Sequence, residues 1–495
     1  MLHNRDGEQK SSRLFGLFSI GIFLFSSTLF GSFEDFKRQQ DAQFKEYKDQ
    51  RDAAFNKYLK EQWQEYTAKQ GGPLYKKPKP KSIPKKAQES QKSLGPVVVV
   101  KAPKPEVQPL KEPEKKVDFI KVEIKDKEKP KPNDISADFF GYKLAFDVDN
   151  SVKLARFYPF SQVGIANYFD AVATSNYESL LHYIRDVQKE LLLNDWGVYL
   201  LVDTIAHRLY ASEDEAKLLS WFLLNKLGYN VKIGLAVKHV VLMHYSKKVI
   251  YSTPNYSFGG KKFYLLSEYA QQKTQRVYTY KQEYPGATKD LDLSLHILPK
   301  LPETLVGKNL SFSYVNKKYV LAFKYNKNLL DFMASYPQAD YETFFNAPLQ
   351  KRTYEEIASE IKEYVDGQKA SWAINFVLAF VQNAFLYQRD DEQFGREKVM
   401  FAQETLVYDK SDCEDRAVLF AYLVKNLFGI GVVGVKYSDH MSTALNIPMQ
   451  GDSVEAYGKK LVIADPTYIN ANIGQNMPQY KNKIPQDFII VRGDN

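Results

Sequence analysis

Cysteine is nearly absent from this chain, because Cys413 is the only one among its 495 residues. A single cysteine excludes an internal disulfide, so the thiol needs another explanation. So little cysteine suits a compartment in which stray thiols are oxidised. Histidine is also scarce, with 7 residues, and none stands at metal-ligand spacing with carboxylates. We therefore expect no metal and no cofactor.

The residues around Cys413 favour a reactive thiol. The run from Cys413 to Gly429 is apolar and helical, and the glycine is a stop signal. Asp412 is a good N-cap, and Asp415 completes a capping box with Asp in place of the usual Glu. The thiol would then lie in the first helical turn, where unpaired N–H groups and the helix dipole favour a thiolate.

Two further residues complete a candidate catalytic triad. A β-branched stretch at 430–436 leads to His440, and a strand-like stretch at 460–464 leads to Asp465. A thiol nucleophile needs a base, and the base needs a carboxylate to orient it. We expect Cys413 to attack, His440 to carry the proton and Asp465 to orient His440. Taken singly, the cysteine could be a buried small hydrophobe and the aspartate an ordinary Asp-Pro turn.

At these positions the chain resembles the transglutaminase-like superfamily, a papain-like group of cysteine acyl-transfer enzymes. The matching residues are Glu404-Thr405-Leu406, Asp412 to Asp415, His440, and Asp465-Pro466-Thr467. Ser411 stands where the family usually has glycine. The resemblance covers about residues 350 to 480, and it implies a thioester formed on a carboxamide or peptide carbonyl. Hydrolysis is favoured over crosslinking, because water is always present.

The chain also contains an apparent internal repeat of this motif. Ser212-Glu-Asp-Glu-Ala216 aligns with Cys413-Glu-Asp-Arg-Ala417 at a constant offset of 201 positions (212 to 413). Further matching pairs are Gly228 with Gly429, His239 within one position of His440, Thr253-Pro254 with Asp465-Pro466, Trp196 with Trp372, and Tyr210 with Tyr387. The first copy lacks the cysteine, the aspartate and the loop 388–412. It is therefore predicted to be degenerate and non-catalytic, and chance similarity is the alternative.

These patterns predict an α+β fold with two papain-like, transglutaminase-type domains. The degenerate domain is placed at 136–267 and the catalytic domain at 336–495. Short alternating runs between them, such as Leu291-Asp-Leu-Ser-Leu295, predict a small antiparallel β-unit at 268–335. That unit is either a separate domain or the part of the sheet that completes the first copy.

Residues 14–31 form an apolar run preceded by Arg5, Lys10 and Arg13. Its length is short for a membrane span and long for a signal-peptide core. We favour an uncleaved transmembrane or signal-anchor helix with its basic end in the cytoplasm, and a cleaved signal peptide is the alternative. Either reading makes the protein extracytoplasmic, and periplasmic if the cell has two membranes.

An aromatic repeat of eleven follows the anchor. Phe33, Phe44, Phe55 and Tyr66 recur at that period, as do Phe36, Tyr47 and Tyr58. Eleven residues make about three helical turns, so the pattern predicts a long helix at 33–70 with one aromatic stripe. The stripe at 33–66 suits self-association, and a solvated helix is the alternative.

Residues 71–135 are rich in Lys, Pro, Glu and Val and are predicted to be a disordered linker. Much of the formal net charge of +9 lies there. No nucleic-acid motif is present. The expected partners are the membrane, through the anchor, and a protein or peptide substrate, with a cell-wall peptide as one candidate. A non-catalytic peptide- or wall-binding scaffold is the alternative function.

Overall fold

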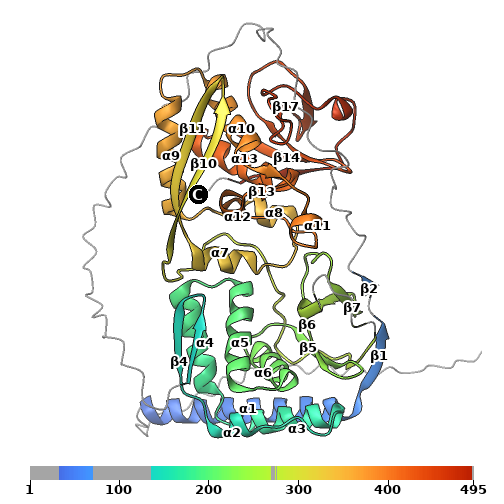
Figure 1. The fold of residues 1–495 in the computed structure, drawn as a ribbon. Coiled ribbons are helices and arrows are strands. Elements are labelled where there is room, and N and C mark those ends of the chain that lie inside the picture. Colours follow the sequence, from blue (N-terminus) through green and yellow to red (C-terminus); the bar gives the residue numbers. More distant parts are fainter. Residues whose placement is uncertain (1–32, 68, 71–134, 269–273, 275, 493–495) are drawn as a thin grey trace, which may run out of the picture. The chain divides into compact units, whose positions relative to one another are not determined.

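The computed structural model describes residues 33–67, 69–70, 135–268, 274 and 276–492, drawn as ribbon in Figure 1. The chain is a mixed α+β protein with several antiparallel sheets, as the sequence predicts. It separates into two compact units, residues 1–50 and 51–495. The predicted anchor at 14–31 and nearly all of the predicted linker lie outside the described residues. No helix among the described residues is long and apolar enough to cross a membrane.

Helix α1 (Phe33–Glu61) contains most of the aromatic repeat. Between residues 36 and 50 its aromatic side chains are exposed: Phe36 is 61% and Phe44 70% accessible. Within the second unit Phe55 of the same stripe is buried, at 1% accessible, and Tyr58 is half-buried against the core. The ring of Phe55 packs edge-on against Phe169 and Tyr284, with centroids 5.5 and 5.1 Å away. The later part of the repeat therefore belongs to the chain's own core.

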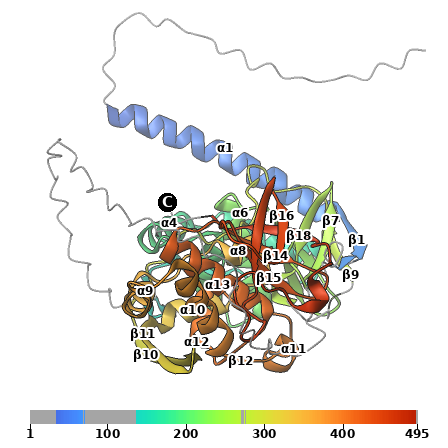
Figure 2. The same ribbon diagram turned by 90° about the horizontal axis from the view of Figure 1, so that it is seen from above.

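The predicted helix at 33–70 is too long. After Glu61 the chain turns into β1 (Trp63–Thr67) and β2 (Lys69–Gln70), and β1 pairs with β9 (Arg276–Tyr280), as Figure 2 shows. Trp63, Tyr66 and Thr67 favour strands, and the edge of the sheet supplies the hydrogen-bond partners. The residues predicted to form the last helical turns therefore form an edge strand instead.

The first half, residues 135–280, has a hairpin and five helices before its sheet. The hairpin is β3 (Ile135–Phe139) and β4 (Tyr142–Phe146). The helices are α2 (Asn150–Leu154), α3 (Gln162–Ala173), α4 (Glu178–Leu191), α5 (Asp195–Leu209) and α6 (Glu213–Lys226). Helix α6 is buried along most of its length and contacts the sheet beside it (Figure 1).

The first sheet has the strand order β1-β9-β5-β6-β8-β7-β2. Its other strands are β5 (Val231–Leu235), β6 (Val240–Tyr245), β7 (Pro254–Phe258) and β8 (Lys261–Tyr264), and the 3₁₀ turn η1 (Leu266–Glu268) follows them. Strands β1 and β2 are separated by one residue, yet they lie at opposite edges of the sheet. One residue spans only about 7 Å between its neighbours, so the sheet curls until its two edges meet along residues 63–70.

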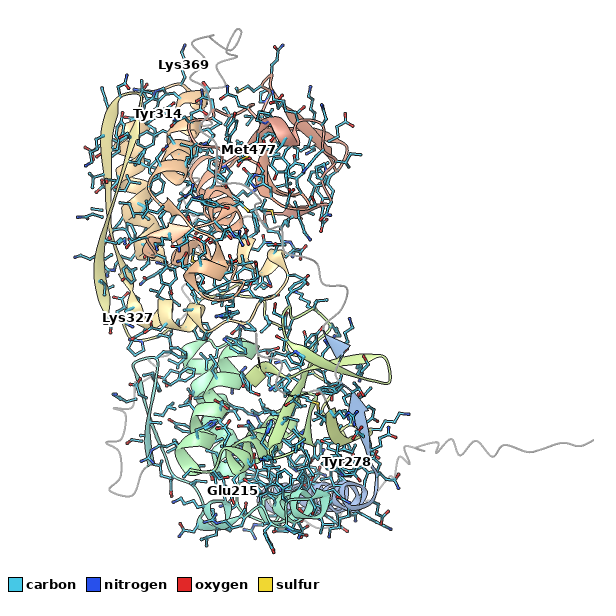
Figure 3. The ribbon with its side chains drawn as sticks, turned by 45° about the vertical axis from the view of Figure 1, so that its right-hand side comes forward. Glu215, Tyr278, Tyr314, Lys327, Lys369 and Met477 are labelled. Atoms are coloured by element: carbon cyan, nitrogen blue, oxygen red, sulfur yellow. The ribbon has the colours of Figure 1, made fainter. Side chains whose placement is uncertain are left out.

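The segment 268–335 is predicted to be either a separate β-unit or the part of the sheet that completes the first copy, and its strands divide between these two alternatives. Strand β9 joins the first sheet, and Leu291–Leu295 forms no strand. Strands β10 (Leu305–Tyr314) and β11 (Lys317–Asn326) form a hairpin of their own, which packs on helices α9 (Lys351–Val365) and α10 (Ala370–Asn383). Figure 3 shows Tyr314 and Lys369 at one end of this hairpin and Lys327 at the other. Alternation predicted strands β9, β10 and β11 correctly and was wrong for Leu291–Leu295, and it carries no information on which sheet each strand joins.

The second half, residues 305–492, continues with helices and a five-stranded sheet. The helices are α7 (Lys327–Ala334), α8 (Tyr341–Phe345), α9 (Lys351–Val365), α10 (Ala370–Asn383), α11 (Asp390–Gln393), α12 (Ala402–Val407) and α13 (Cys413–Phe428), with the turn η2 (Pro478–Tyr480). The strands are β12 (Leu386–Tyr387), β13 (Lys410–Ser411), β14 (Val432–Lys436), β15 (Met441–Leu445), β16 (Ser453–Ala456), β17 (Lys459–Ala464) and β18 (Asp487–Ile490). All but β12 and β13 belong to the main sheet, ordered β16-β17-β15-β14-β18.

The two sheets share one topology. The order β9-β5-β6-β8-β7 in the first matches β18-β14-β15-β17-β16 in the second, and every pair is antiparallel. The hairpin registers also agree, since Leu235 faces Val240 in the first sheet and Lys436 faces Met441 in the second. That correspondence has the same offset of 201 as the internal sequence repeat (235 to 436, 240 to 441). Strand order and register therefore favour an internal duplication over chance similarity.

Candidate active site

Cys413 is the first residue of helix α13, as the capping pattern predicts. Asp412 is the N-cap, and its backbone N–H donates to Asp415 Oδ2 at 3.2 Å. The other Asp415 oxygen accepts the Met400 N–H at 2.8 Å. The helix ends at Gly429, whose φ of 65° is the left-handed conformation of a glycine C-cap. Helix start, cap and stop were all readable from the sequence.

His440 and Asp465 are joined by a hydrogen bond. His440 directly precedes β15, and Asp465 directly follows β17, which pairs with β15. His440 Nε2 lies 2.8 Å from Asp465 Oδ2, and both side chains are buried. The other Asp465 oxygen accepts the Thr467 N–H at 2.9 Å. With Nε2–H donated to the carboxylate, Nδ1 is left with the lone pair that a general base needs.

The thiol lies beside this pair. The backbone N–H of Met441, the residue after His440, hydrogen-bonds to the Cys413 sulfur and acts to lower the thiol pKa. Tyr480 stacks on the His440 ring with centroids 4.8 Å apart. Cys413 and Asp465 both contribute to raising the pKa of Tyr480, after burial as the largest cause. The structure thus brings all three predicted residues together.

The expected thiolate is not what the surroundings favour. The Cys413 side chain is 0% accessible, and its thiol donates to Glu414 Oε2 at 3.0 Å. Burial raises the thiol pKa well above its usual value, and the Glu414 and Asp412 carboxylates raise it further. These effects raise the thiol pKa by more than the start of the helix lowers it. A thiol has one proton, so in this arrangement Glu414 rather than His440 accepts it.

Three buried carboxylates meet beside the thiol, a feature that the sequence analysis missed. Asp390, Asp412 and Glu414 each place one oxygen within 4.8 Å of the others. Hard oxygen ligands of this kind suit a divalent cation such as Ca²⁺. The clue in the sequence was only partial, because Asp412 and Glu414 flank the cysteine while Asp390 belongs to the distant helix α11.

The Glu404-Thr405 part of the motif has a supporting role. Glu404 Oε2 accepts the Phe401 N–H at 3.1 Å, and Oε1 accepts Lys398 Nζ at 2.7 Å. Thr405 Oγ1 donates to the Phe401 carbonyl at 3.2 Å. All of these groups are buried. The motif therefore folds the segment that packs over the start of α13.

Arg416 is a second buried group that the sequence analysis did not single out. Its guanidinium donates to Ser411 Oγ at 3.1 Å and to the Gln382 and Phe385 carbonyls at 3.2 and 2.9 Å. Burial lowers the pKa of Arg416 to about 10, against the opposing effects of Tyr387, Asp412 and other acidic groups. It remains charged at neutral pH and fastens α13 to the end of α10.

The first half has the same hairpin without the triad. His239 occupies the place of His440, since its carbonyl accepts the Ala236 N–H at 2.9 Å just as that of His440 accepts the Tyr437 N–H at 2.8 Å. Ser212, in the place of Cys413, is exposed and caps α6.

The sequence alignment is wrong at the third position of the triad. His244 pairs with Tyr264 where Leu445 pairs with Val462, so Ser267, not Thr253, matches Asp465. Thr253 instead directly precedes β7, the counterpart of β16. The first half therefore has no carboxylate at the position that orients the histidine in the second.

No family model, curated protein or solved structure matches the chain.

Proposed function

We propose that the second half is a cysteine-dependent acyl-transfer site of the transglutaminase-like kind, acting on a carboxamide or peptide carbonyl. The observation that carries the proposal is the His440–Asp465 hydrogen bond placed beside the Cys413 sulfur. Helix, hairpin and strand end supply the nucleophile, base and orienting carboxylate in the papain-like manner. The shared strand order of the two sheets supports a two-domain arrangement with a degenerate first copy.

The proposed reaction runs through a thioester. His440 Nδ1 takes the Cys413 proton, and the sulfur attacks the carbonyl carbon. The backbone N–H of Cys413 is the candidate donor to the oxyanion. His440 then gives its proton to the leaving amine, and the C–N bond breaks. Water, deprotonated by His440, attacks the thioester and releases the acid and the thiol. Hydrolysis is favoured over transfer to an amine, because water needs no second binding site.

A non-catalytic binding role is the second candidate. The raised thiol pKa and the complete burial of Cys413 favour it. Catalysis requires the thiol to turn its S–H from Glu414 to His440, which then takes the proton, and it requires the site to open. A module that only binds a peptide or wall component requires neither.

Alkylation of the single thiol separates the two candidates. In the full chain we expect iodoacetamide to modify Cys413 at a rate that falls when His440 is replaced by alanine, because the base then no longer takes the proton. His239→Ala is the matched control, since that residue holds the equivalent place in the first half. It should leave the rate unchanged. A rate indifferent to His440→Ala would refute an activated thiol and leave the binding role.

The location of the protein is part of the proposal. The apolar run at 14–31 would anchor it in the membrane with residues 33–495 outside the cytoplasm. The exposed aromatic side chains of Phe36, Phe44 and Tyr47 on α1 would then be available for self-association. Those of Phe55 and Tyr58 would not, because both pack into the chain's own core.

A further inference from the structure

Gln382, near the end of α10, uses its whole side chain to hold the turn that carries Asp465. Nε2 donates to the Asp465 carbonyl at 3.0 Å and to the Ala471 carbonyl at 3.1 Å. Oε1 accepts the Asn470 N–H at 3.1 Å. The side chain is 1% accessible. Water cannot replace these bonds at such a site, so their loss leaves buried backbone groups without partners.

The same residue is tied to the nucleophile helix. The Gln382 carbonyl accepts Arg416 Nη1 at 3.2 Å, and Arg416 lies one turn after Cys413 on α13. The side chain of Gln382 thus fixes the Asp465 turn, and its backbone carbonyl accepts the hydrogen bond from Arg416 on α13. Through this one residue, the two elements that carry Cys413 and Asp465 are held to a common helix.

The first half lacks the amide as well as the aspartate. Matching the tryptophans that begin the two helices (196 and 372) places Ala206 opposite Gln382. Matching the tyrosines that follow them (210 and 387) places Ile205 there. Both residues are apolar and buried. Where no carboxylate has to be oriented, the position that matches Gln382 has no amide.

We infer that Gln382 is a positioning residue for the proposed reaction: it sets the Asp465 turn, and through Asp465 the orientation of His440. This rests on the proposed function. A bond from a helix is a suitable device, because the residues after β17 form a loop and a loop alone holds a carboxylate less rigidly than a packed element does.

The test is a double-mutant cycle on Cys413 alkylation in the full chain. Gln382→Leu should slow modification by on the order of 10-fold, since a misplaced base loses its alignment with the thiol. The same substitution in a His440→Ala background should have no further effect. Asn383→Ala is the matched control, because within the described part of the chain that side chain bonds only to Ala379 on its own helix, and it should leave the rate unchanged.

A second variant keeps the proposal testable if Gln382→Leu does not fold. Gln382→Glu keeps the shape and the acceptor for the Asn470 N–H, but the ionised carboxylate has no donor for the two carbonyls. Protonation restores one donor. Its defect relative to the wild type should therefore shrink as the pH falls through the pKa of the introduced carboxyl. A merely structural role would not produce that pH profile.

The outcomes distinguish the two proposals. If His440→Ala changes nothing, the proposed function fails. If His440→Ala slows modification while the Gln382 variants fold and react like the wild type, only the positioning role fails. An equal loss from Gln382→Leu with and without His440 would also overturn it, because the residue would then act on the fold and not through the base.

Discussion

Replacement of Glu414 by glutamine should lower the pKa of the Cys413 thiol. The thiol donates to Glu414 Oε2 at 3.0 Å, and both side chains are fully buried. A carboxylate at that distance disfavours the thiolate, whereas a neutral amide of the same shape does not. At an effective dielectric of about 20, two unit charges 3 Å apart repel by about 5 kcal/mol.

Loss of that repulsion favours the thiolate, so we expect the pKa of the Cys413 thiol to fall in the variant, while the Asp412 carboxylate continues to raise it. Burial, the largest cause of the raised pKa, remains in the variant. The thiol should therefore still titrate above an exposed cysteine unless His440 takes over the proton.

The single cysteine makes the measurement direct. In a chain labelled with ¹³C at cysteine Cβ, one resonance reports the titration of Cys413, whether or not reagents reach it. Glu392→Gln is the control, because that carboxylate is exposed on the neighbouring helix α11, and the midpoint should not move. A midpoint that stays or rises in folded Glu414→Gln would refute the electrostatic account of the thiol.

Two other predictions concern the fold. Phe55→Ala should cost about 3–5 kcal/mol of unfolding free energy through the cavity it leaves, whereas Phe44→Ala, one repeat earlier and 70% accessible, should cost almost nothing in chemical denaturation. Burial lowers the pKa of His244 from 6.5 to about 3, so the unfolded state binds more protons between those values and stability falls as the pH drops through 6.5. Leucine stands at the matching place in the second half. His244→Leu should remove a loss of unfolding free energy on the order of 4 kcal/mol between pH 6.5 and 3, measured from denaturation curves at the two pH values. Unchanged curves would contradict it.

The second half was the most predictable part, because its local patterns agree with its tertiary contacts. Asp412, Cys413 and Gly429 define a helix with its start and its stop, and the strands that deliver His440 and Asp465 were expected in place. Turn and capping chemistry depends on neighbours in the chain, so the sequence contains it. The protonation of the thiol was not predictable. It depends on burial and on carboxylates whose distances the spacing does not give.

Errors arose where a segment could join more than one partner. Residues 63–67 have charges and aromatics that fit a helical repeat, but they pair with β9 at an open sheet edge. One of the two alternatives for residues 268–335 grouped strand β9 with the hairpin that follows it, whereas β9 completes the first sheet. Pairing between distant strands is set by which edges are available. Periodicity along a single segment cannot reveal this.

The shared strand order of the two sheets gives the strongest support for the proposal that chemistry belongs to the second half only. Both halves have the helix, the hairpin and a histidine at its tip, so these features serve the fold as well as any function. The second half alone adds the thiol, the Asp465 carboxylate, the Gln382 amide that holds its turn, and the segment 388–412, which supplies two of the three clustered carboxylates. Burying a carboxylate, an imidazole and an amide in one network costs stability unless each is satisfied. The first half shows that the scaffold folds without this network, so the added polar groups are better explained by a function at Cys413 than by the needs of the fold.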